Sequence, residues 1–148
     1  MQFSQVHSTK YQIRNAALPH HACVAINREA IMQVDHQHIW ETYTSAWKAE
    51  SSDDKRALIG ASLARECAYQ DPLAKTSGWD ELLAYMADFH RQVPGGHFVT
   101  RRFRYHNGQS AAQWDMLDAQ GQVIGDGVSV GHYNDAGRLV TVTGFFDT

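Results

Sequence analysis

The sequence predicts an α+β fold in which a strongly bent antiparallel sheet wraps around three helices as a cone-shaped barrel. Apolar side chains recur at helical spacing in three segments before residue 94, and the remainder consists of short strand patterns separated by turns. Strands that are grouped late in the chain, instead of alternating with helices, are typical of α+β proteins. Glycines inside the last two strand patterns indicate sharp bends, and a sheet bent around helices leaves a cone with an open mouth.

Composition indicates a globular protein with a single core. The chain has 148 residues, of which 43% are hydrophobic and 20% charged. Its net charge of −3 argues against a nucleic-acid partner, and no apolar run approaches the roughly 20 residues that span a bilayer. Cys23 and Cys67 form neither a disulfide framework nor a metal motif. Without a recognisable signal peptide, we expect a cytoplasmic protein that has no membrane partner.

The chain divides into an arm over residues 1–34 and a domain over residues 35–148. The arm carries a net charge of +2, the remainder carries −5, and the arm shows no sustained hydrophobic period. We expect at most one short helix near residues 27–34 and partial disorder elsewhere in the arm.

Two helices are predicted at the start of the domain. Asp35 is placed to cap a helix that runs to about Glu50, and its apolar stripe comprises Ile39, Trp40, Tyr43, Ala46 and Trp47. Ser52 is placed to cap the second helix, because Asp53 and Asp54 would follow in its first turn. The apolar positions of this second helix are Ala57, Leu58, Ala61 and Leu63.

A strand and a third helix follow. In an extended segment that ends at Pro72, side chains alternate between faces, so Cys67, Tyr69 and Asp71 share one face. Ser77 is placed to cap a helix from Trp79 to about Val93, which the sequence Pro94-Gly95-Gly96 ends. Its buried stripe comprises Trp79, Leu82, Leu83, Met86, Phe89 and Val93.

Four strands are predicted over residues 97–106, 110–118, 122–133 and 138–146, joined by hairpins into a meander. Asn107-Gly108 is a strong signal for a tight hairpin turn. The third of these strands has two possible inner faces. One carries Ser129, Gly131 and Tyr133, and the other carries Asp126, Val128, Val130 and His132. Both faces contain small or apolar residues, so the pattern does not choose between them.

Asp71 is the strongest candidate for chemistry. A carboxylate that faces an apolar cavity is a usable base near neutral pH, but an aspartate before proline is also a common turn cap. Tyr43 lies on the inner stripe of the first helix, where its hydroxyl would donate to an oxyanion or simply belong to a core aromatic. Trp47, Trp79 and Trp114 are expected as pocket wall or core.

No metal or cofactor site is predicted. Nine histidines occur, but the two clusters His20-His21 and His36-x-His38 lack the spacing of metal ligands. No glycine-rich loop that cradles phosphate is present.

Several short motifs together resemble the SnoaL-like branch of the nuclear-transport-factor-two-like superfamily over residues 35–147. They are Tyr43-x-x-x-Trp47, Tyr69-Gln70-Asp71-Pro72, Ser77-Gly78-Trp79, Tyr133-Asn134-Asp135-Ala136-Gly137-Arg138-Leu139 and Gly144-Phe145-Phe146. The resemblance implies a cone-shaped α+β barrel, a deep apolar pocket and a homodimer formed through the sheet. In the related ketosteroid isomerases the general base precedes a proline and matches Asp71, and the oxyanion-binding tyrosine matches Tyr43. The third member of that site, a protonated aspartate, matches Ser129 here, so this chain has a hydroxyl in place of an acid.

These matches suggest an enzyme that transfers a proton by general-base catalysis on a small apolar carbonyl compound, as an isomerase, cyclase or dehydratase does. Asp71, Tyr43 and Ser129 would be catalytic, and a small hydrophobic ligand would contact Trp47, Tyr69, Trp79, Trp114, Met116 and Tyr133. One alternative is a protein of the same fold that binds a small molecule without converting it. Another is a dimerisation module whose pocket is filled by Trp47, Trp79, Trp114 and Met116.

Overall fold

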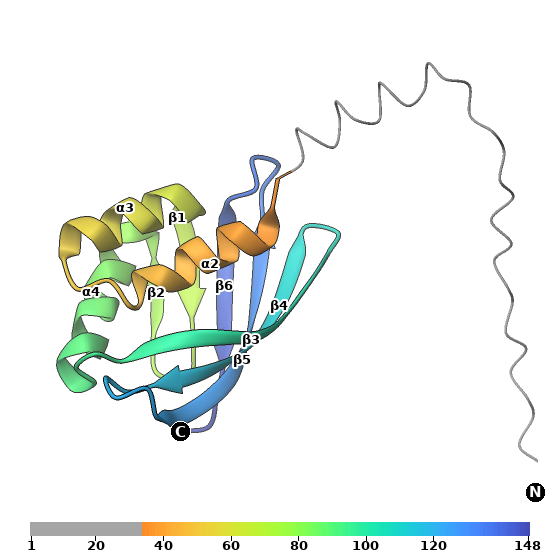
Figure 1. Ribbon diagram of the computed structural model, residues 1–148. Helices are drawn as coiled ribbons and strands as arrows, with labels where there is room; N and C mark the ends of the chain where they lie inside the picture. Colours follow the sequence, from red (N-terminus) through yellow and green to blue (C-terminus); the bar gives the residue numbers. More distant parts are fainter. Residues whose placement is uncertain (1–33) are drawn as a thin grey trace, which may run out of the picture. The chain divides into compact units, whose positions relative to one another are not determined.

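The computed structural model describes residues 34–148 (Figure 1). The arm and the short helix predicted near residues 27–34 lie outside the described residues, apart from Val34. In chain order the elements are α2 (His36–Ala46), α3 (Ser52–Ser62), β1 (Leu63–Gln70), β2 (Lys75–Ser77), α4 (Gly78–Gln92), β3 (His97–His106), β4 (Gln109–Leu117), β5 (Val123–Tyr133) and β6 (Leu139–Phe145).

The six strands form one curved sheet in the order β2-β1-β6-β5-β4-β3, and the helices lie within its curve (Figure 1). This arrangement confirms the predicted cone-like α+β fold and the meander of β3 to β6. The sheet is mixed, however, because β1 pairs with β6 in parallel, and it is open between its edge strands β2 and β3. Hairpin signals reveal only strands that follow each other along the chain, so the distant β1–β6 pairing and the three-residue β2 were missed.

The curvature of the sheet has a local cause. Each of the pairings β1–β6, β3–β4, β4–β5 and β5–β6 contains a shift of register, and such irregularities bend and twist a sheet. Gly127 on β5 lets the indole of its cross-strand partner Trp114 fold over the backbone. A Cβ atom at Gly127 would lie 2.4 Å from this ring and 2.5 Å from the carbonyl oxygen of Phe145.

The N-terminal caps differ between α2 and α3. Asp35 caps α2 as predicted, because its carboxylate accepts a hydrogen bond of 3.0 Å from the backbone N–H of His38. In α3 the cap is Ser51 instead of Ser52, since the Ser51 hydroxyl accepts from the N–H of Asp54. The one-residue shift leaves both acidic residues of the first turn near the positive end of the helix dipole.

The buried faces also differ. Trp40, Tyr43, Ala46 and Trp47 are buried as predicted, although α2 ends at Ala46 and not near Glu50. The stripe predicted for the second helix is wrong, since Ala57 and Ala61 are exposed and Leu63 belongs to β1. The buried face of α3 consists of Lys55, Ile59 and Ser62, spaced four and three residues apart. Two of these three residues are polar, so the apolar pattern of the sequence does not indicate this face.

Helix α4 packs its buried residues Leu82 and Met86 toward the sheet, and it ends at Gln92 just before Pro94. Ser77 is at the N-cap position as predicted, but its side chain makes no capping bond. Instead the backbone N–H of Ser77 donates to the Glu81 carboxylate at 2.7 Å.

One end of the cone is filled by a close-packed apolar core between the helices and the sheet. Its fully buried side chains are Ile59, Leu63, Cys67, Leu82, Met86, Leu139 and Val142. Hydrogen bonds fix the helices to the strands: the Trp40 indole donates to the Thr100 hydroxyl, and the Trp79 indole donates to the Ala64 carbonyl, both at 3.0 Å. The helices are thereby held rigidly over the inner face of the sheet.

We expect Gly127→Ala to lower the free energy of unfolding by about 1–3 kcal/mol, because the new methyl group would overlap a rigid indole and a backbone carbonyl. Gly60→Ala in α3 is the matched control. Its methyl group would lie 3.6 Å from the Trp79 ring, an ordinary contact, so the gain in helix propensity should stabilise the protein by about 0.5–1 kcal/mol. Urea unfolding followed by circular dichroism measures both changes. Equal stability of the two variants would contradict the close packing of Trp114 and the Phe145 carbonyl against Gly127.

Candidate functional site

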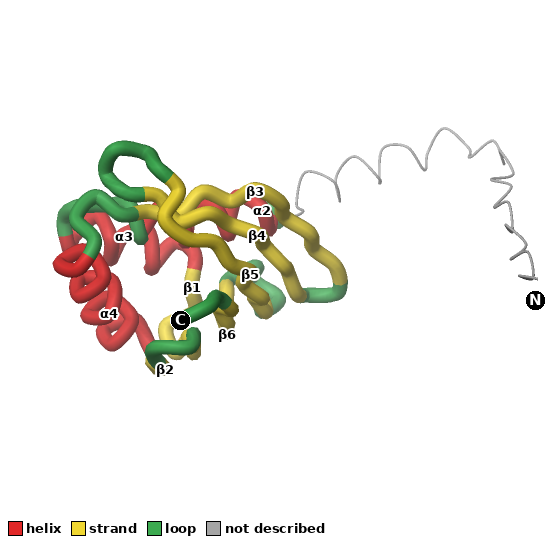
Figure 2. Tube along the Cα trace, turned by 90° about the horizontal axis from the view of Figure 1, so that it is seen from below, coloured by secondary structure: helices red, strands yellow, loops and turns green. Residues whose placement is uncertain are grey.

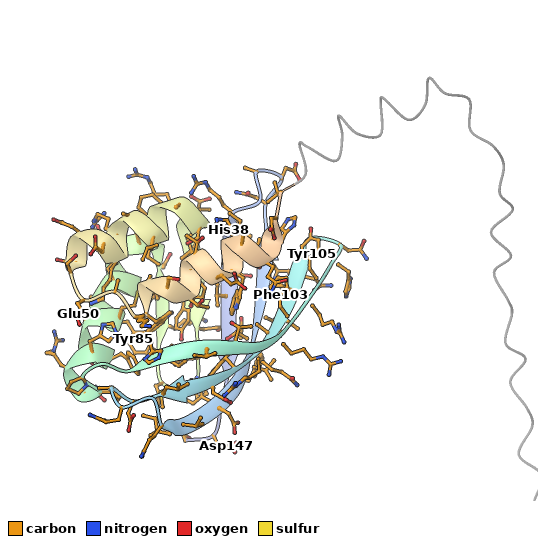
Figure 3. The ribbon with its side chains drawn as sticks, viewed as in Figure 1. His38, Glu50, Tyr85, Phe103, Tyr105 and Asp147 are labelled. Carbon is orange, nitrogen blue, oxygen red and sulfur yellow. The ribbon has the colours of Figure 1, made fainter. Side chains whose placement is uncertain are left out.

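A cavity of about 460 Å³ adjoins the apolar core, with which it shares Trp40, Tyr43, Trp47 and Tyr69. Its deepest lining residues are buried and include Trp40, Tyr43, Ser129 and Gly144. Exposed residues surround its mouth: Leu73, Gln92, Ile124, Asp126 and Asp147. Seen from below, the C-terminal end lies between α4 and β5 (Figure 2). Figure 3 places Tyr85 beside α4 and Asp147 at this lower end of the fold.

Strand β5 turns Ser129, Gly131 and Tyr133 inward, since all three are buried while Asp126 and His132 are exposed. The register then aligns Ser129 with Gly144 on β6, and Gly144 follows the pair formed by Gln70 and Thr143. A Cβ atom at Gly144 would lie 3.4 Å from the Cβ of Asp71 and 3.7 Å from the Ser129 hydroxyl oxygen. The side chains of Asp71 and Ser129 therefore both lie next to Gly144 in the cavity lining.

The Asp71 carboxylate accepts four hydrogen bonds. Its Oδ1 accepts from the backbone N–H groups of Leu73 and Ala74 at 2.8 and 2.9 Å, as a turn cap does. Its Oδ2 accepts from the hydroxyls of Tyr69 and Tyr85 at 2.5 and 2.8 Å. The turn cap is therefore confirmed, and the second oxygen binds two tyrosines of the cavity. The role of Asp71 as a base stays a prediction.

Two hydroxyls in the cavity are each held by an indole. The Trp47 Nε1–H donates to the Tyr43 hydroxyl at 3.1 Å, and the Trp114 Nε1–H donates to the Ser129 hydroxyl at 3.0 Å. Tyr43 is 3% exposed and Ser129 is 7% exposed. Within residues 34–148 neither hydroxyl donates to an acceptor, so each retains a proton that a ligand oxygen could accept.

Burial raises the pKa of the three cavity phenols. The pKa values of Tyr43, Tyr69 and Tyr85 all lie well above the ordinary value of 10.0, with burial as the largest cause in each. The negative charge of Asp71 adds to the increase for all three. These phenols are therefore neutral hydrogen-bond donors throughout the physiological pH range.

Aromatic side chains form most of the cavity wall. Trp47 lies at its centre, with the rings of Tyr85, Phe89 and Phe98 edge-on to it at centroid distances of 5.4–5.9 Å. The complete aromatic lining is Trp40, Tyr43, Trp47, Tyr69, Tyr85, Phe89, Phe98, Trp114 and Phe146.

The structure brings together seven of the nine residues predicted for the site: Tyr43, Trp47, Tyr69, Asp71, Trp114, Met116 and Ser129. Trp79 and Tyr133 are not among the lining residues. The Trp79 ring lies over Arg65 and beside Gly60, and the Tyr133 hydroxyl is hydrogen-bonded to Ser110 at 2.9 Å. Open space remains in the cavity although Trp47, Trp114 and Met116 line it.

Tyr85 is the functional candidate that sequence reasoning missed. It lies on α4 between the buried positions Leu82 and Met86 and the cavity residue Phe89. A tyrosine beside a buried helical stripe is usually a rim residue. Only the placement of α4 across from Asp71 brings its hydroxyl to the carboxylate.

Within the part of the chain that the structure describes, no group of three His, Cys, Asp or Glu side chains is arranged to hold a metal ion. The histidine pair His20-His21, at which no metal site is predicted, lies outside this part. None of the helices from residue 34 onward is long and apolar enough to cross a membrane.

Comparisons with solved structures identify the fold. A protein of Agrobacterium tumefaciens, provisionally described as an isomerase of the SnoaL-like family, is 29% identical with a TM-score of 0.71; the match covers 76% of this chain and 97% of that one. A SnoaL-like protein of unknown function from Burkholderia thailandensis is 17% identical with a TM-score of 0.60, covering 76% and 95%. A protein of Jannaschia, provisionally described as a SnoaL-like polyketide cyclase, is 16% identical with a TM-score of 0.62, covering 78% and 90%. No family model and no curated protein sequence matches this chain at a significant level.

We expect the free energy of unfolding to fall as the pH rises above about 10. Unfolded phenols lose their protons near the ordinary pKa of 10.0, whereas Tyr43, Tyr69 and Tyr85 in the folded chain keep theirs. Tyr133 also keeps its proton, because burial raises its pKa to about 12. The folded state then binds more protons than the unfolded state, so each such phenol costs about 1.4 kcal/mol of stability per pH unit.

Phenolate absorbance at 295 nm measures this directly. At pH 11 the native protein should absorb less than the same protein unfolded in guanidinium chloride. Equal absorbance would show that the cavity phenols titrate as free tyrosines do.

Proposed function

We propose that this chain, which has the SnoaL-like fold of the nuclear-transport-factor-two-like superfamily, is an enzyme that moves a proton next to the carbonyl group of a small apolar compound. Isomerisation, cyclisation and dehydration all begin with such a step. The observation that carries the proposal is that the side chains of Asp71 and Ser129 both lie next to Gly144 in the lining of an aromatic cavity.

In this proposal Asp71 is the general base. The Cα–H bond next to the substrate carbonyl breaks, its proton passes to Oδ2 of Asp71, and its electron pair forms an enolate. Oδ2 already accepts from two phenols, so one of them must yield to the substrate. Tyr85 is less buried than Tyr69, and it is the one that we expect to move aside.

The enolate oxygen would accept hydrogen bonds from Tyr43 and Ser129. Both hydroxyls are buried, both retain a proton for donation, and each is oriented by an indole N–H. Donors that are already oriented when charge develops are worth far more in a water-poor cavity than in water. The serine replaces a carboxylic acid in this role and is the weaker donor.

A second candidate function is the binding of a small hydrophobic molecule without conversion. The specific observation that favours it is the complete hydrogen bonding of Asp71, whose two oxygens already have two donors each. In that case Asp71 would serve as the anchor of the turn and of two tyrosines, and the ligand would be recovered unchanged.

Dimerisation through the sheet belongs to the same proposal. The outer groove that includes Val128 and Phe145 offers an apolar surface, with Phe145 57% exposed, and the ion pair between Arg101 and Asp115 lies beside it. An exposed apolar surface rimmed by charges is typical of protein interfaces.

The test is deuterium exchange at the carbon next to the carbonyl of 2-tetralone in D₂O, followed by NMR. Wild-type protein should exchange this proton faster than buffer does, and Asp71→Asn should lower the catalysed rate by about 10²–10⁴-fold. Tyr43→Phe and Ser129→Ala should each lower it by about 10–10³-fold. Tyr85→Phe should keep the rate within about tenfold of wild type, because it removes a competitor for Oδ2.

Asn is the appropriate replacement at residue 71 because its side-chain oxygen still accepts from the N–H groups of Leu73 and Ala74. Asp135→Asn, in the turn between β5 and β6, is a control that removes a carboxylate outside the cavity lining. An unchanged rate in Asp71→Asn would contradict the mechanism. Saturable binding of 2-tetralone without any exchange would favour the binding protein.

A further inference from the structure

The charges that line the cavity are all of one sign. Three carboxylates line it, those of Asp71, Asp126 and Asp147, and among residues 34–148 no Lys, Arg or His side chain does. None of the three carboxylates takes part in an ion pair within residues 34–148. Arg101 shares the outer groove with Asp126 and Asp147, but its guanidinium is bonded to Asp115 at 2.5 Å.

The sign of the charge that lines a cavity indicates the charge of the ligand that it binds. A cleft lined by one sign of charge concentrates ligands of the opposite sign. The donors to Asp71 are two neutral phenols and two backbone N–H groups, so no cation balances it. A cationic ligand would supply the missing countercharge.

The aromatic wall independently suits a cation. Trp47 is met edge-on by Phe89 and Phe98, with interplanar angles of 82° and 80°. Nine aromatic side chains line a volume of about 460 Å³. The faces of such rings attract ammonium groups, most strongly where water is excluded.

The inner end of the cavity suits a hydrogen-bond acceptor of the ligand and not a cation. Tyr43 and Ser129 are more than nine-tenths buried, and within the described chain their hydroxyl protons have no acceptor. Each hydroxyl oxygen already accepts one hydrogen bond and keeps its proton for donation, so a ligand oxygen at this end would meet two donors. The exposed carboxylates of Asp126 and Asp147 lie at the mouth.

We propose that the cavity takes a cationic substrate, an apolar amine whose ammonium group lies toward the carboxylates of the mouth and whose carbonyl oxygen reaches Tyr43 and Ser129. The carbonyl part rests on the proposed function, whereas the preference for a cation rests on the charges alone. Carboxylic acids, phosphates and coenzyme A thioesters are excluded, because each would bring negative charge to a cavity that already holds three carboxylates.

Three probes that share one ring and chain test the preference: 3-phenylpropylamine, 3-phenylpropanol and 3-phenylpropanoate. Isothermal titration calorimetry with the full chain at pH 7 and low ionic strength measures their affinities. The ammonium probe should bind about tenfold more tightly than the alcohol, and the carboxylate should bind most weakly. Added salt should weaken the ammonium probe and leave the alcohol nearly unchanged.

The double variant Asp126→Asn/Asp147→Asn should reduce the affinity for the ammonium probe by about three- to tenfold and leave that for the alcohol unchanged. Asp135→Asn is the matched control that removes one charge away from the cavity, and it should leave both affinities unchanged.

Equal affinity for ammonium and alcohol, tighter binding of the carboxylate, or no binding of the ammonium probe would overturn the proposal. Deuterium exchange into 2-tetralone, which is neutral, reports on proton transfer in every case. The charge preference and the catalytic function can therefore fail separately.

Discussion

The hydrogen bonds of the Asp71 carboxylate are the constraint on which the cavity depends. One oxygen fixes the turn that follows β1, and the other binds the hydroxyls of Tyr69 and Tyr85, which come from β1 and α4. A single side chain therefore ties a strand end, a turn and a helix to each other. Each bond to a charged acceptor is stronger than a bond between neutral groups, so this junction is rigid where the chemistry would need it.

Tryptophans give this cavity both its shape and its polarity. Trp114 packs closely over Gly127, and its N–H donates to the hydroxyl of Ser129. Trp47 packs among aromatic rings, and its N–H holds the hydroxyl of Tyr43. The indole carbon atoms exclude water while the indole nitrogens orient two buried donors. The same two tryptophans therefore pack the cavity wall and orient the hydroxyls that would bind a ligand.

The fold by itself does not select a function, because related structures carry provisional descriptions as different as isomerase and polyketide cyclase. The discriminating features are those of this chain: a serine near the aspartate, phenols bonded to that aspartate, and a lining to which residues 34–148 contribute no basic side chain. Proton transfer and preference for a cation are compatible, because Asp71 would accept the proton while Asp126 and Asp147 at the mouth would attract the ammonium group. A neutral pair of donors at the inner end leaves the charge of the cavity unchanged.

The sequence by itself determined the order of the elements apart from β2, the meander of β3 to β6 and the cap at Asp35, because hydrophobic period, turn residues and capping act within a few residues of each other. Period 2 along β1 likewise determined that Tyr69 and Asp71 face the same way. Only the tertiary structure decided the parallel pairing of β1 with β6, the inward face of β5 and the contact of Tyr85 with Asp71. These join residues that are distant in sequence, and their partners become defined only when the sheet curves and α4 packs across it. The same packing brings Trp114 to Ser129 and leaves Trp79 and Tyr133 outside the cavity.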